Sequence, residues 1–467
     1  MFLGLDLGTS NVKALAVDAT GQIVAQGSAP VERFETPDGG IEQDIEQIWD
    51  ATRRAIRQTV AEMDAKSIEA IGISSQGGAL QLLDANDRPL GRVISWMDRR
   101  GKPYDQGIEE TWGTSYLVDH IGSNLSTTTL GQIMRLRQDA PEVLGAAKAI
   151  GYVGDLIVGR FCGRRAHDAT SLSLAMLYNP RLRGVDHELL ARLGIDDKRQ
   201  PDLLAANEPA GRLTDQAASQ TGLKAGIPIS PAVHDQYAAD LGTGAVAEGD
   251  VLIGTGTAWV ILAVTNRLTP PVAERTFVCT HPVDGLFGQL FSMGGVGAVI
   301  QWAVGLIGED MPDAATLDQW IASVPAGADG LRFELPATAG RAAAIVSPSG
   351  GTFVGRNDGH GPKHLLRAVF ECLALELAKR LDWFARADLP MKRVLLSGPA
   401  ASGGAIGQIV ANALNRPVTC LREPATGAMG ATTIAHSLVD RRTNLAVLAS
   451  QWAIDGDVVM PEVSTRE

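Results

Sequence analysis

Residues 1–13, MFLGLDLGTSNVK, are the stretch that decides the fold. An apolar run leads into Asp6, and Gly8-Thr9-Ser10 separates it from a second β-rich run over residues 12–17. This pattern predicts a β-hairpin with a tight turn of small polar residues. Such a turn presents backbone N–H groups and two hydroxyls on one side, which suits the oxygens of a phosphate. The alternative is a surface hairpin whose acid is merely solvated.

Asp6 stands at the edge of this turn, where a magnesium ion that bridges phosphates needs an oxygen ligand. We therefore predict Asp6 as the metal-positioning acid. The predicted phosphate contacts of the same hairpin are Gly8, Thr9, Ser10 and Lys13. Gly21 then turns the chain into a third strand over residues 22–28, so the first three strands form an antiparallel meander.

A glycine-rich loop follows the next strand. A helix is expected over residues 45–63, because its apolar residues recur at spacings of three and four. The strand over residues 68–74 then ends in Ser75-Gln76-Gly77-Gly78. A strand end that opens into such a loop is a common ligand site in α/β sheets, and a plain tight turn explains the pattern equally well. We predict Gln76, Gly77 and Gly78 as substrate-binding residues.

An aromatic and charged segment, Trp96-Met97-Asp98-Arg99-Arg100, follows an expected strand that starts at residue 93. Sugars are often bound by an aromatic face that covers C–H groups while charged side chains take the hydroxyls. The alternative is a core tryptophan beside a surface ion pair. These residues alone leave both interpretations open; the family resemblance given below implies Trp96, Asp98 and Arg100 as residues of a sugar site.

Asp235, in the segment PAVHDQYAA of residues 231–239, is the candidate for the chemistry. Phosphorylation of a hydroxyl by ATP needs aligned phosphates, magnesium to neutralise charge, and an acceptor for the hydroxyl proton. A close, desolvated carboxylate is a sufficient acceptor, so we predict Asp235 as general base and Gln236 beside it in the substrate site. An N-cap role before a helix over residues 236–241 is compatible with that assignment. His234 is expected to be a hydrogen-bonding neighbour rather than a second base.

A second glycine-and-threonine turn, Gly254-Thr255-Gly256-Thr257, separates two further expected strands, residues 250–253 and 258–264. The hairpin construction of residues 2–17 is therefore repeated. Two such turns that face one another across a cleft would hold a triphosphate from both sides. No GxxxxGK[ST] motif occurs in the chain, which disfavours the P-loop NTPases.

Composition and charge are those of a globular protein with two or three domains: 467 residues, 45% hydrophobic and 20% charged. The net charge of −12 disfavours a broad nucleic-acid-binding face. No apolar run approaches the ~20 residues that span a bilayer, and no signal-peptide pattern opens the sequence. The four cysteines are far apart, without CxxC spacing, and predict neither a zinc site nor a disulfide framework. We therefore expect a cytoplasmic protein.

These segments together resemble the FGGY carbohydrate kinases of the actin/hexokinase-like superfamily, from residue 2 to about residue 435. The resemblance implies an α/β fold of two actin/ribonuclease-H-like domains with mixed sheets flanked by helices, and an ATP cleft between them. It gives Asp235 the place of the family's catalytic base. The nucleotide-binding residues that it implies in the second half are Gly254, Thr255, Gly256, Thr257, Gly297, Gly398, Pro399, Ala400 and Ser402. Pro399 replaces a customary Gly, which removes one backbone N–H.

The expected domains are residues 1–243, with the sugar site and the first hairpin, and residues 244–440, with the second hairpin and the adenosine motif. Residues 179–229 are expected to form a peripheral, partly irregular subdomain. Residues 441–467 are expected to be a peripheral tail. Sequence does not fix the assembly, although dimers are the commonest outcome for soluble enzymes of this sort.

The expected activity is ATP- and Mg²⁺-dependent phosphorylation of a small ketose such as xylulose, or of a related polyol. Xylulose-kinase-like members of the family carry Met-His after the Gln and glycerol-kinase-like members carry Arg-Glu, whereas this chain has Gly77-Gly78. Either the substrate is bulkier here, or other residues supply the contacts. The alternatives are an actin-like ATPase that gates a protein partner and a catalytically weak sugar-binding relative. Neither nucleic acid nor a membrane is expected as a partner.

Overall fold

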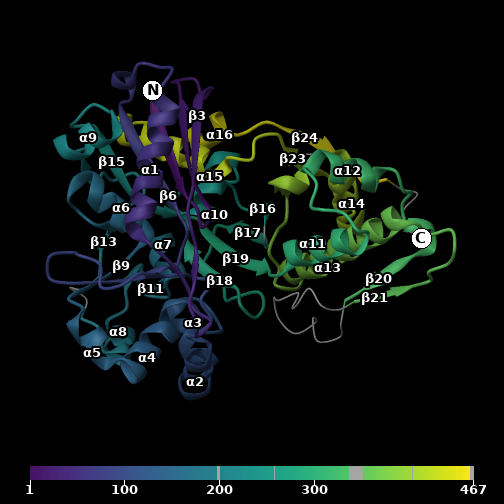
Figure 1. Ribbon diagram of the computed structural model, residues 1–467, viewed down its shortest axis with the longest axis horizontal. Helices are drawn as coiled ribbons and strands as arrows, with labels where there is room; N and C mark the ends of the chain where they lie inside the picture. The colour runs from purple at the N-terminus through teal and green to yellow at the C-terminus, as the bar shows by residue number, and fades with distance from the viewer. Residues whose placement is uncertain (197–199, 257, 336–350, 402, 463–467) are drawn as a thin grey trace.

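The computed structural model describes residues 1–196, 200–256, 258–335, 351–401 and 403–462. Two α/β lobes lie side by side, and the larger lobe holds the N-terminal half of the chain (Figure 1). Each lobe is built on a mixed β-sheet with helices packed on it, as the sequence predicts. Thr257 and Ser402, both predicted to contact the nucleotide, lie outside the described residues.

The first sheet places the first hairpin near its centre. Its strands are β1 (Phe2–Leu7), β2 (Asn11–Val17), β3 (Ile23–Pro30), β6 (Ala70–Ser75), β10 (Ala166–His167), β13 (Asp202–Leu203), β14 (Gly211–Arg212) and β15 (Pro228–His234). The order is β13-β10-β15-β6-β1-β2-β3, and β14 pairs with β15. The first three strands form the predicted antiparallel meander, whereas β6 and β15 run parallel to β1. The carboxyl ends of β1, β6 and β15 therefore meet at one edge of the sheet.

The second sheet repeats this layout. Its strands are β16 (Asp250–Thr255), β17 (Trp259–Thr265), β18 (Phe277–Thr280), β19 (Phe287–Met293), β22 (Arg393–Ser397), β23 (Val418–Leu421) and β24 (Gly456–Val459). The order is β18-β19-β17-β16-β22-β23-β24. β16 pairs antiparallel with β17 and β17 with β19, while β18 lies at the edge beyond β19; β22 pairs in parallel with β16 as β6 does with β1. The two predicted hairpins, β1 with β2 and β16 with β17, thus occupy equivalent places in the two sheets.

Helices cover both sheets. On the first sheet lie α1 (Ile45–Val60), α6 (Val153–Cys162), α9 (Asp215–Thr221), α10 (Asp235–Thr243), α15 (Thr426–Val439) and α16 (Leu445–Gln451). The second lobe contains α11 (Val296–Leu306), α12 (Ala314–Ala322), α13 (Pro362–Arg386), α14 (Gly404–Leu414) and the strand pair β20 (Arg332–Glu334) and β21 (Thr352–Val354). The apolar face of α13 is buried in the core of that lobe.

A smaller antiparallel sheet and a group of helices extend the first lobe. Its strands are β4 (Phe34–Glu35), β5 (Ile41–Gln43), β7 (Leu80–Leu83), β8 (Val93–Ile94) and β9 (Ala149–Tyr152), in the order β4-β5-β8-β7-β9. Beside it lie α2 (Lys102–Trp112), α3 (Thr114–Ile121), α4 (Thr129–Asp139), α5 (Pro141–Ala146), α7 (Ala169–Leu174) and α8 (His187–Leu193), with the strand pair β11 (Tyr178–Asn179) and β12 (Gly184–Val185). This part shares one apolar core with α10 and β19.

Two glycines let α15, which is late in the chain, pack closely on the first lobe. A Cβ atom at Gly72 of β6 would lie 1.8 Å from the backbone oxygen of Ala431 in α15. A Cβ atom at Gly430 of α15 would lie 1.7 Å from the backbone oxygen of Ala238 in α10. These approaches are possible only without a side chain. The helix that connects β23 to the later part of the chain is therefore fixed against the sheet that carries the first hairpin.

Two predictions about peripheral segments are wrong. Residues 179–229 contribute β13 and β14 to the first sheet, and α9 packs against α1 and α6. In the expected tail, α16 packs on α10 and α15, and β24 forms the edge strand of the second sheet. The buried indole of Trp452, next to Phe2, joins this segment to the first strand. Both segments were misjudged because their short apolar runs gain partners only from distant strands.

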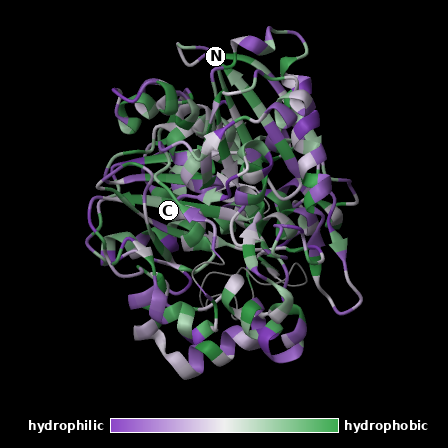
Figure 2. Cartoon of the chain, turned by 90° about the vertical axis from the view of Figure 1, so that its left-hand side faces the viewer, coloured by the Kyte–Doolittle hydropathy of each residue, from purple (hydrophilic) through white to green (hydrophobic). Residues whose placement is uncertain are grey.

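Hydrophobic strands lie inside the molecule, and hydrophilic residues concentrate on the outer helices and loops (Figure 2). No helix in the described part of the chain is long and apolar enough to cross a membrane.

Candidate active site

Side chains along β1 point alternately to the two faces of the sheet, and this alternation determines the direction of Asp6. Leu3, Leu5 and Leu7 belong to the core that also contains α1. The intervening residues face α15: a Cβ atom at Gly4 would lie 2.1 Å from the backbone oxygen of Ala428. Since successive strand residues point to opposite faces, Asp6 also faces α15. A Cβ atom at Gly427, in the first turn of that helix, would lie 3.2 Å from the carboxylate of Asp6.

The carboxylate of Asp6 lies between two polar neighbours on adjacent strands. Ser74 of β6 donates a hydrogen bond to Oδ1 of Asp6 at 2.8 Å. Lys13 of β2 is the cross-strand partner of Asp6. Burial and the negative charge of Asp235 raise the pKa of Asp6 to about 6, although Ser74 and Lys13 act in the opposite direction. The charge of Asp235 acts on Asp6, so the two carboxylates lie in one site although they are 229 residues apart in the sequence.

Asp235 stands where β15 ends and α10 begins. It is the first residue of the helix, and His234 holds the N-cap position that the alternative interpretation gave to the acid. The Asp235 side chain is 31% exposed, so it reaches the surface of the site. Burial among the surrounding atoms raises its pKa to about 6. A carboxylate poised near neutral pH is suited to accept a proton.

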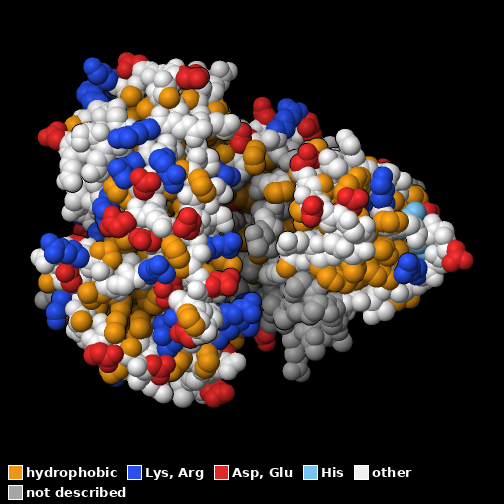
Figure 3. Space-filling model, in the orientation of Figure 1, with side chains coloured by type: hydrophobic (Ala, Val, Ile, Leu, Met, Phe, Trp, Pro, Cys, Tyr) orange, Lys and Arg blue, Asp and Glu red, His pale blue; other side chains and the backbone are white. Residues whose placement is uncertain are grey.

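Gln236 brings the second hairpin close to this acid. A Cβ atom at Gly254, near the end of β16, would lie 3.4 Å from Oε1 of Gln236. The helix that starts with Asp235 in the first lobe therefore meets the phosphate turn predicted in the second lobe. The space-filling view shows the surface hollowed between the two lobes (Figure 3).

A short chain of hydrogen bonds joins the first hairpin turn to the predicted sugar site. The indole Nε1–H of Trp96 donates to the Thr9 hydroxyl at 2.9 Å, and that hydroxyl donates to Oε1 of Gln76 at 3.1 Å. The amide Nε2 of Gln76 is buried and has no hydrogen-bond partner among the described residues. Trp96 is 44% exposed and is not a core tryptophan. An exposed aromatic ring beside an unused amide donor fits a polyhydroxylated ligand.

The same geometry changes the role expected of Thr9. Its hydroxyl both donates and accepts, so it is committed to Gln76 and Trp96. Its backbone oxygen accepts a hydrogen bond from the side chain of Gln43 at 3.0 Å. Thr9 therefore connects the hairpin to the sugar site through its side chain. Contacts to a phosphate at this turn are left to the backbone and to exposed Ser10.

Asp98 and Arg100 form an internal network and do not face the site openly. The Asp98 side chain is 0% exposed, and its oxygens accept from Arg100, from the backbone N–H of Ile41 and from Gln132. Burial opposes ionisation, but these hydrogen bonds leave the pKa of Asp98 below its usual value. Arg100 also bridges Asp38 and Glu42. The predicted direct contact of Asp98 with a hydroxyl is therefore corrected: the pair fixes β5 and α4 behind Trp96.

Thr255 joins the second hairpin to the predicted adenosine loop. Its hydroxyl donates to the backbone oxygen of Ser397 at 2.6 Å and accepts from the N–H of Ala400 at 3.0 Å. Gly398 has φ = +85°, and a Cβ atom there would lie 2.7 Å from the backbone oxygen of Thr255. The backbone N–H of Gly256 donates a hydrogen bond to the backbone oxygen of Ala258 at 3.1 Å.

The remaining nucleotide-site candidates lie close to this loop in sequence or at a helix start. Pro399 and Ala400 belong to a short 3₁₀ helix, residues Pro399–Ala401. Gly297 lies in the first turn of α11, whose N-cap Gly295 has φ = +79°. A helix start exposes unpaired N–H groups. The structure brings Thr255, Gly398 and Ala400 together, and it gives no direct contact between Gly297 and them.

The sequence analysis missed what surrounds the Gly77–Gly78 turn. A Cβ atom at Gly77 would lie 2.5 Å from Cδ2 of His234 and 2.9 Å from Cβ of Leu174. A Cβ atom at Gly78, where φ is +71°, would lie 3.1 Å from Cβ of Thr128. Two consecutive glycines were the only available signal that other side chains enclose this turn.

The carboxylate of Asp6 could bind a metal ion, and the carboxylate of Asp235 acts on Asp6 in the same site. No cluster of three or more metal-ligating side chains exists among the residues that the structure describes. Mg²⁺ keeps several waters and is usually bound by one or two carboxylates together with substrate phosphates. Asp6, whose pKa is raised partly by the charge of Asp235, fits such an ion because a cation would relieve that repulsion.

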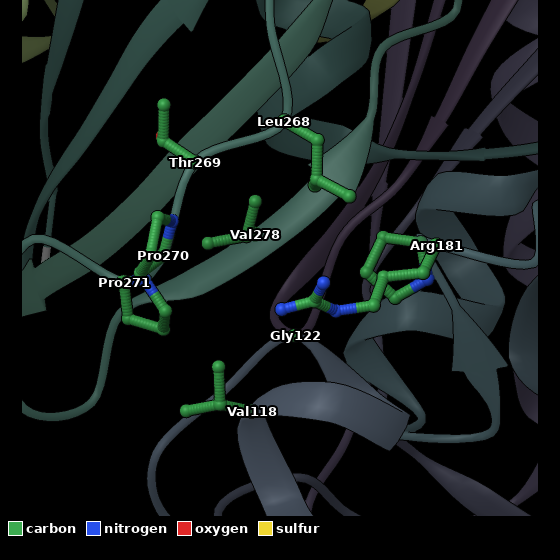
Figure 4. A pocket seen from close by; sticks show the side chains of 9 residues that line it. Val118, Gly122, Arg181, Leu268, Thr269, Pro270, Pro271 and Val278 are labelled. Carbon is green, nitrogen blue, oxygen red and sulfur yellow. The ribbon is translucent and has the colours of Figure 1, made fainter. Parts of the chain in front are cut away.

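A pocket of about 250 Å³ lies elsewhere on the molecule, between α3, the turn after β11 and the loop after β17 (Figure 4). Its lining includes Val118, Pro270 and Val278, with the Arg181 side chain at one side. No residue of the site described above lines it.

Comparison with known proteins covers nearly the whole chain. The FGGY family of carbohydrate kinases matches with its N-terminal domain over residues 1–242 and with its C-terminal domain over residues 251–437. A glycerol kinase from Thermococcus gammatolerans is 27% identical, over 97% of this chain and 92% of its own. A xylulose kinase from Bacillus subtilis is 24% identical, over 93% of this chain and 87% of its own.

Among solved structures, the ligand-bound xylulose kinase from Lactobacillus acidophilus has a similar fold. Its TM-score is 0.88 at 22% identity, with 99% of this chain and 94% of that chain covered. This likeness supports the two-domain α/β fold with mixed sheets. Relatives with different substrates are equally similar in sequence, so similarity alone does not select one sugar.

Proposed function

The chain belongs to the FGGY family of carbohydrate kinases, and on that basis we propose that it transfers the terminal phosphoryl group of ATP to a hydroxyl of a small ketose or polyol. The observation that carries the proposal is the convergence of Asp6, Asp235 and Gly254 at one edge of both sheets. Xylulose is the first candidate among ketoses. We propose residues 1–243 and 244–440 as the domains, with α15 of the second packed on the sheet of the first and β24, from the tail, at the edge of the second sheet. The four free thiols support a cytoplasmic location.

Asp235 is the proposed general base. A hydroxyl becomes a better nucleophile as its proton passes to a nearby acceptor in the transition state. The carboxylate of Asp235 is partly exposed, and its pKa of about 6 leaves it mostly ionised at neutral pH. It would take the proton from the attacking hydroxyl while that oxygen forms the new bond to phosphorus and ADP leaves in line.

Asp6, Lys13 and the two turns are proposed to hold the phosphates. Mg²⁺ bound through Asp6 would supply neutralisation of the phosphate charge. Lys13, the cross-strand partner of Asp6, adds a positive charge on the same face. The turns at Gly8–Ser10 and Gly254–Gly256 would offer backbone N–H groups from opposite lobes. Contacts of this kind align the reacting atoms, which is the main requirement of phosphoryl transfer.

Trp96 and Gln76 support a carbohydrate as the acceptor. Trp96 offers an exposed ring face, and Gln76 has an amide donor without a partner among the described residues. An actin-like ATPase that gates a protein partner has no use for such a site. A catalytically weak sugar-binding relative remains the second candidate, because Pro399 removes one backbone donor from the predicted adenosine loop.

The direct test is ADP release measured over a panel of ketoses, aldoses and polyols at saturating Mg²⁺ and ATP. We expect sugar-dependent turnover by the wild type and a loss of about 10²–10⁴ in kcat for Asp235→Asn, with ATP binding retained. Asp215→Asn is the matched control, because Asp215 is an exposed acid at the first position of α9. ADP release that no sugar accelerates would favour the ATPase alternative, and ATP binding without turnover would favour the sugar-binding alternative.

A further inference from the structure

The Gly77–Gly78 turn lies at the end of β6, directly after Gln76, and therefore borders the proposed sugar site. Neither glycine has a side chain to offer a substrate. The reason is steric: a Cβ atom at position 77 would lie 2.5 Å from Cδ2 and 2.9 Å from Nε2 of His234. Carbon atoms of real side chains essentially never approach so closely, so the imidazole already occupies the space in question.

His234 comes from a different strand and stands next to the proposed base. It is the last residue of β15, only 6% exposed, and its Nε2 atom lies 3.3 Å from Oδ1 of Asp235. Its Nδ1 atom is buried without a hydrogen-bond partner among the described residues. Burial lowers the pKa of His234 to about 3, so the ring is neutral at physiological pH.

Leu174 and Thr128 complete the enclosure of the turn. The Cβ atom of Leu174 would lie 2.9 Å from a Cβ atom at Gly77. Thr128 is held by a hydrogen bond from its hydroxyl to the backbone oxygen of Leu174 at 3.1 Å. Its φ of +53° is unusual for a β-branched residue. Such strain persists only where the surrounding structure fixes it, and it is concentrated at functional sites.

We propose that His234 is the specificity-determining wall of the sugar site, in the position that a side chain from residue 77 would otherwise fill. This inference rests on the proposed kinase function and deepens it. Because the wall is bulky, it selects substrates that present a compact end beside the hydroxyl that reacts. Longer groups at that end are excluded by the ring, because the ring is packed against Gly77 and cannot move aside.

The variant His234→Ala removes the imidazole ring and tests the proposed wall directly. A pocket distinguishes substrates that differ by one carbon by about 10–200-fold in kcat/KM. We therefore expect His234→Ala to raise, by about tenfold or more, the kcat/KM of a substrate one carbon longer relative to that of the preferred substrate. A ratio that stays within about twofold of the wild-type ratio would overturn the proposal, whatever happens to kcat itself.

A reciprocal pair of variants tests the packing. We expect Gly77→Ala to lower the melting temperature and the sugar kcat/KM, because the new methyl group overlaps His234. Adding His234→Ala should recover part of both losses. Adding His281→Ala is the matched control: His281 is a second buried, neutral histidine, which packs on Tyr237 and does not contact Gly77. Equal recovery with His281→Ala, or full activity of Gly77→Ala alone, would refute the contact.

The experiments distinguish a failure of the proposed kinase function from a failure of the proposed role of His234. If the wild type phosphorylates no sugar in the panel, the proposed function fails, while the melting temperatures of the four variants still report whether His234 and Gly77 are coupled. If the wild type is an active kinase and the substrate ratio does not move, the function stands and the wall does not. Binding of ATP by each variant verifies that the fold is intact.

Discussion

The proposed base should reduce the stability of the unliganded protein, and Asp235→Asn should reveal the size of that effect. Burial raises the pKa of Asp235 from 3.8 to about 6. One pKa unit corresponds to about 1.4 kcal/mol between protonation states, so the ionised form is disfavoured by up to about 3 kcal/mol. The side chain is 31% exposed. Solvent screening therefore reduces the expected gain of Asp235→Asn to about 1–2 kcal/mol at pH 7.

The pH dependence gives the prediction its sign. A carboxyl whose folded-state pKa is raised contributes stability that is full below pH 3.8 and lost as pH rises through about 6. Asparagine is neutral at every pH and does not lose this contribution. The stabilisation by Asp235→Asn should therefore be largest at pH 7 and above, decline between pH 6 and 4, and vanish below that range. Asp6 should add to the stabilisation by Asp235→Asn, because the charge of Asp235, besides burial, raises the pKa of Asp6.

Thermal unfolding without ligands, in low-salt buffers from pH 4 to 8, measures the difference between Asp235→Asn and the wild type. Asp215→Asn provides the baseline for an exposed acid at the same helix position. The variant should melt higher at pH 7 while its kcat is lower by about 10²–10⁴. A variant that melts lower at pH 7, or a difference that is independent of pH, would refute the claim that burial strains this carboxylate.

Three further predictions follow from the geometry. The kcat/KM of the wild type should fall about tenfold for each pH unit below 6, because Asp235 is then protonated; a profile flat down to pH 5 would contradict its role. Gly430→Ala should destabilise by about 3 kcal/mol or more, since its Cβ atom would lie 1.7 Å from a backbone oxygen of α10, whereas Gly145→Ala, with open space around it, should be neutral or slightly stabilising. Trp96→Ala should raise the sugar KM by about tenfold and leave the ATP KM unchanged, and equal changes in both would argue against ring stacking.

Local patterns were sufficient to predict the two hairpins and a helix over residues 45–63, which the structure ends at Val60. Their periodicity and turn residues are properties of neighbouring positions, and β1, β2, β16, β17 and α1 form where they were expected. The acids Asp6 and Asp235 remain candidates: Asp6 lies near the end of β1, and Asp235 directly follows β15. Their proximity is a property of the parallel order of β1, β6 and β15, which no local pattern contains.

The sugar site shows where a sequence motif misleads. Trp96, Asp98 and Arg100 form one motif, yet only the tryptophan is exposed. Asp98 is enclosed because β5 and α4 supply the N–H of Ile41 and the amide of Gln132 as donors. Neither partner is close to it in sequence. Whether an acid binds substrate or supports a neighbour depends on which donors reach it first, and only the packed structure decides that.

The ionised carboxylates of Asp6 and Asp235 lower the stability of the unliganded protein, and the reactants of the proposed kinase reaction would relieve this effect. Burial and the charge of Asp235 raise the free energy of ionising Asp6, and burial does the same at the partly exposed Asp235. A cation between Asp6 and the phosphates would remove part of that repulsion, and a proton from the substrate hydroxyl would remove more at Asp235. The cation would arrive with the phosphates of ATP, and the proton would come from the substrate hydroxyl. Under the proposed function, the strain that the fold maintains through β1, β15 and α15 would therefore be released as phosphoryl transfer proceeds.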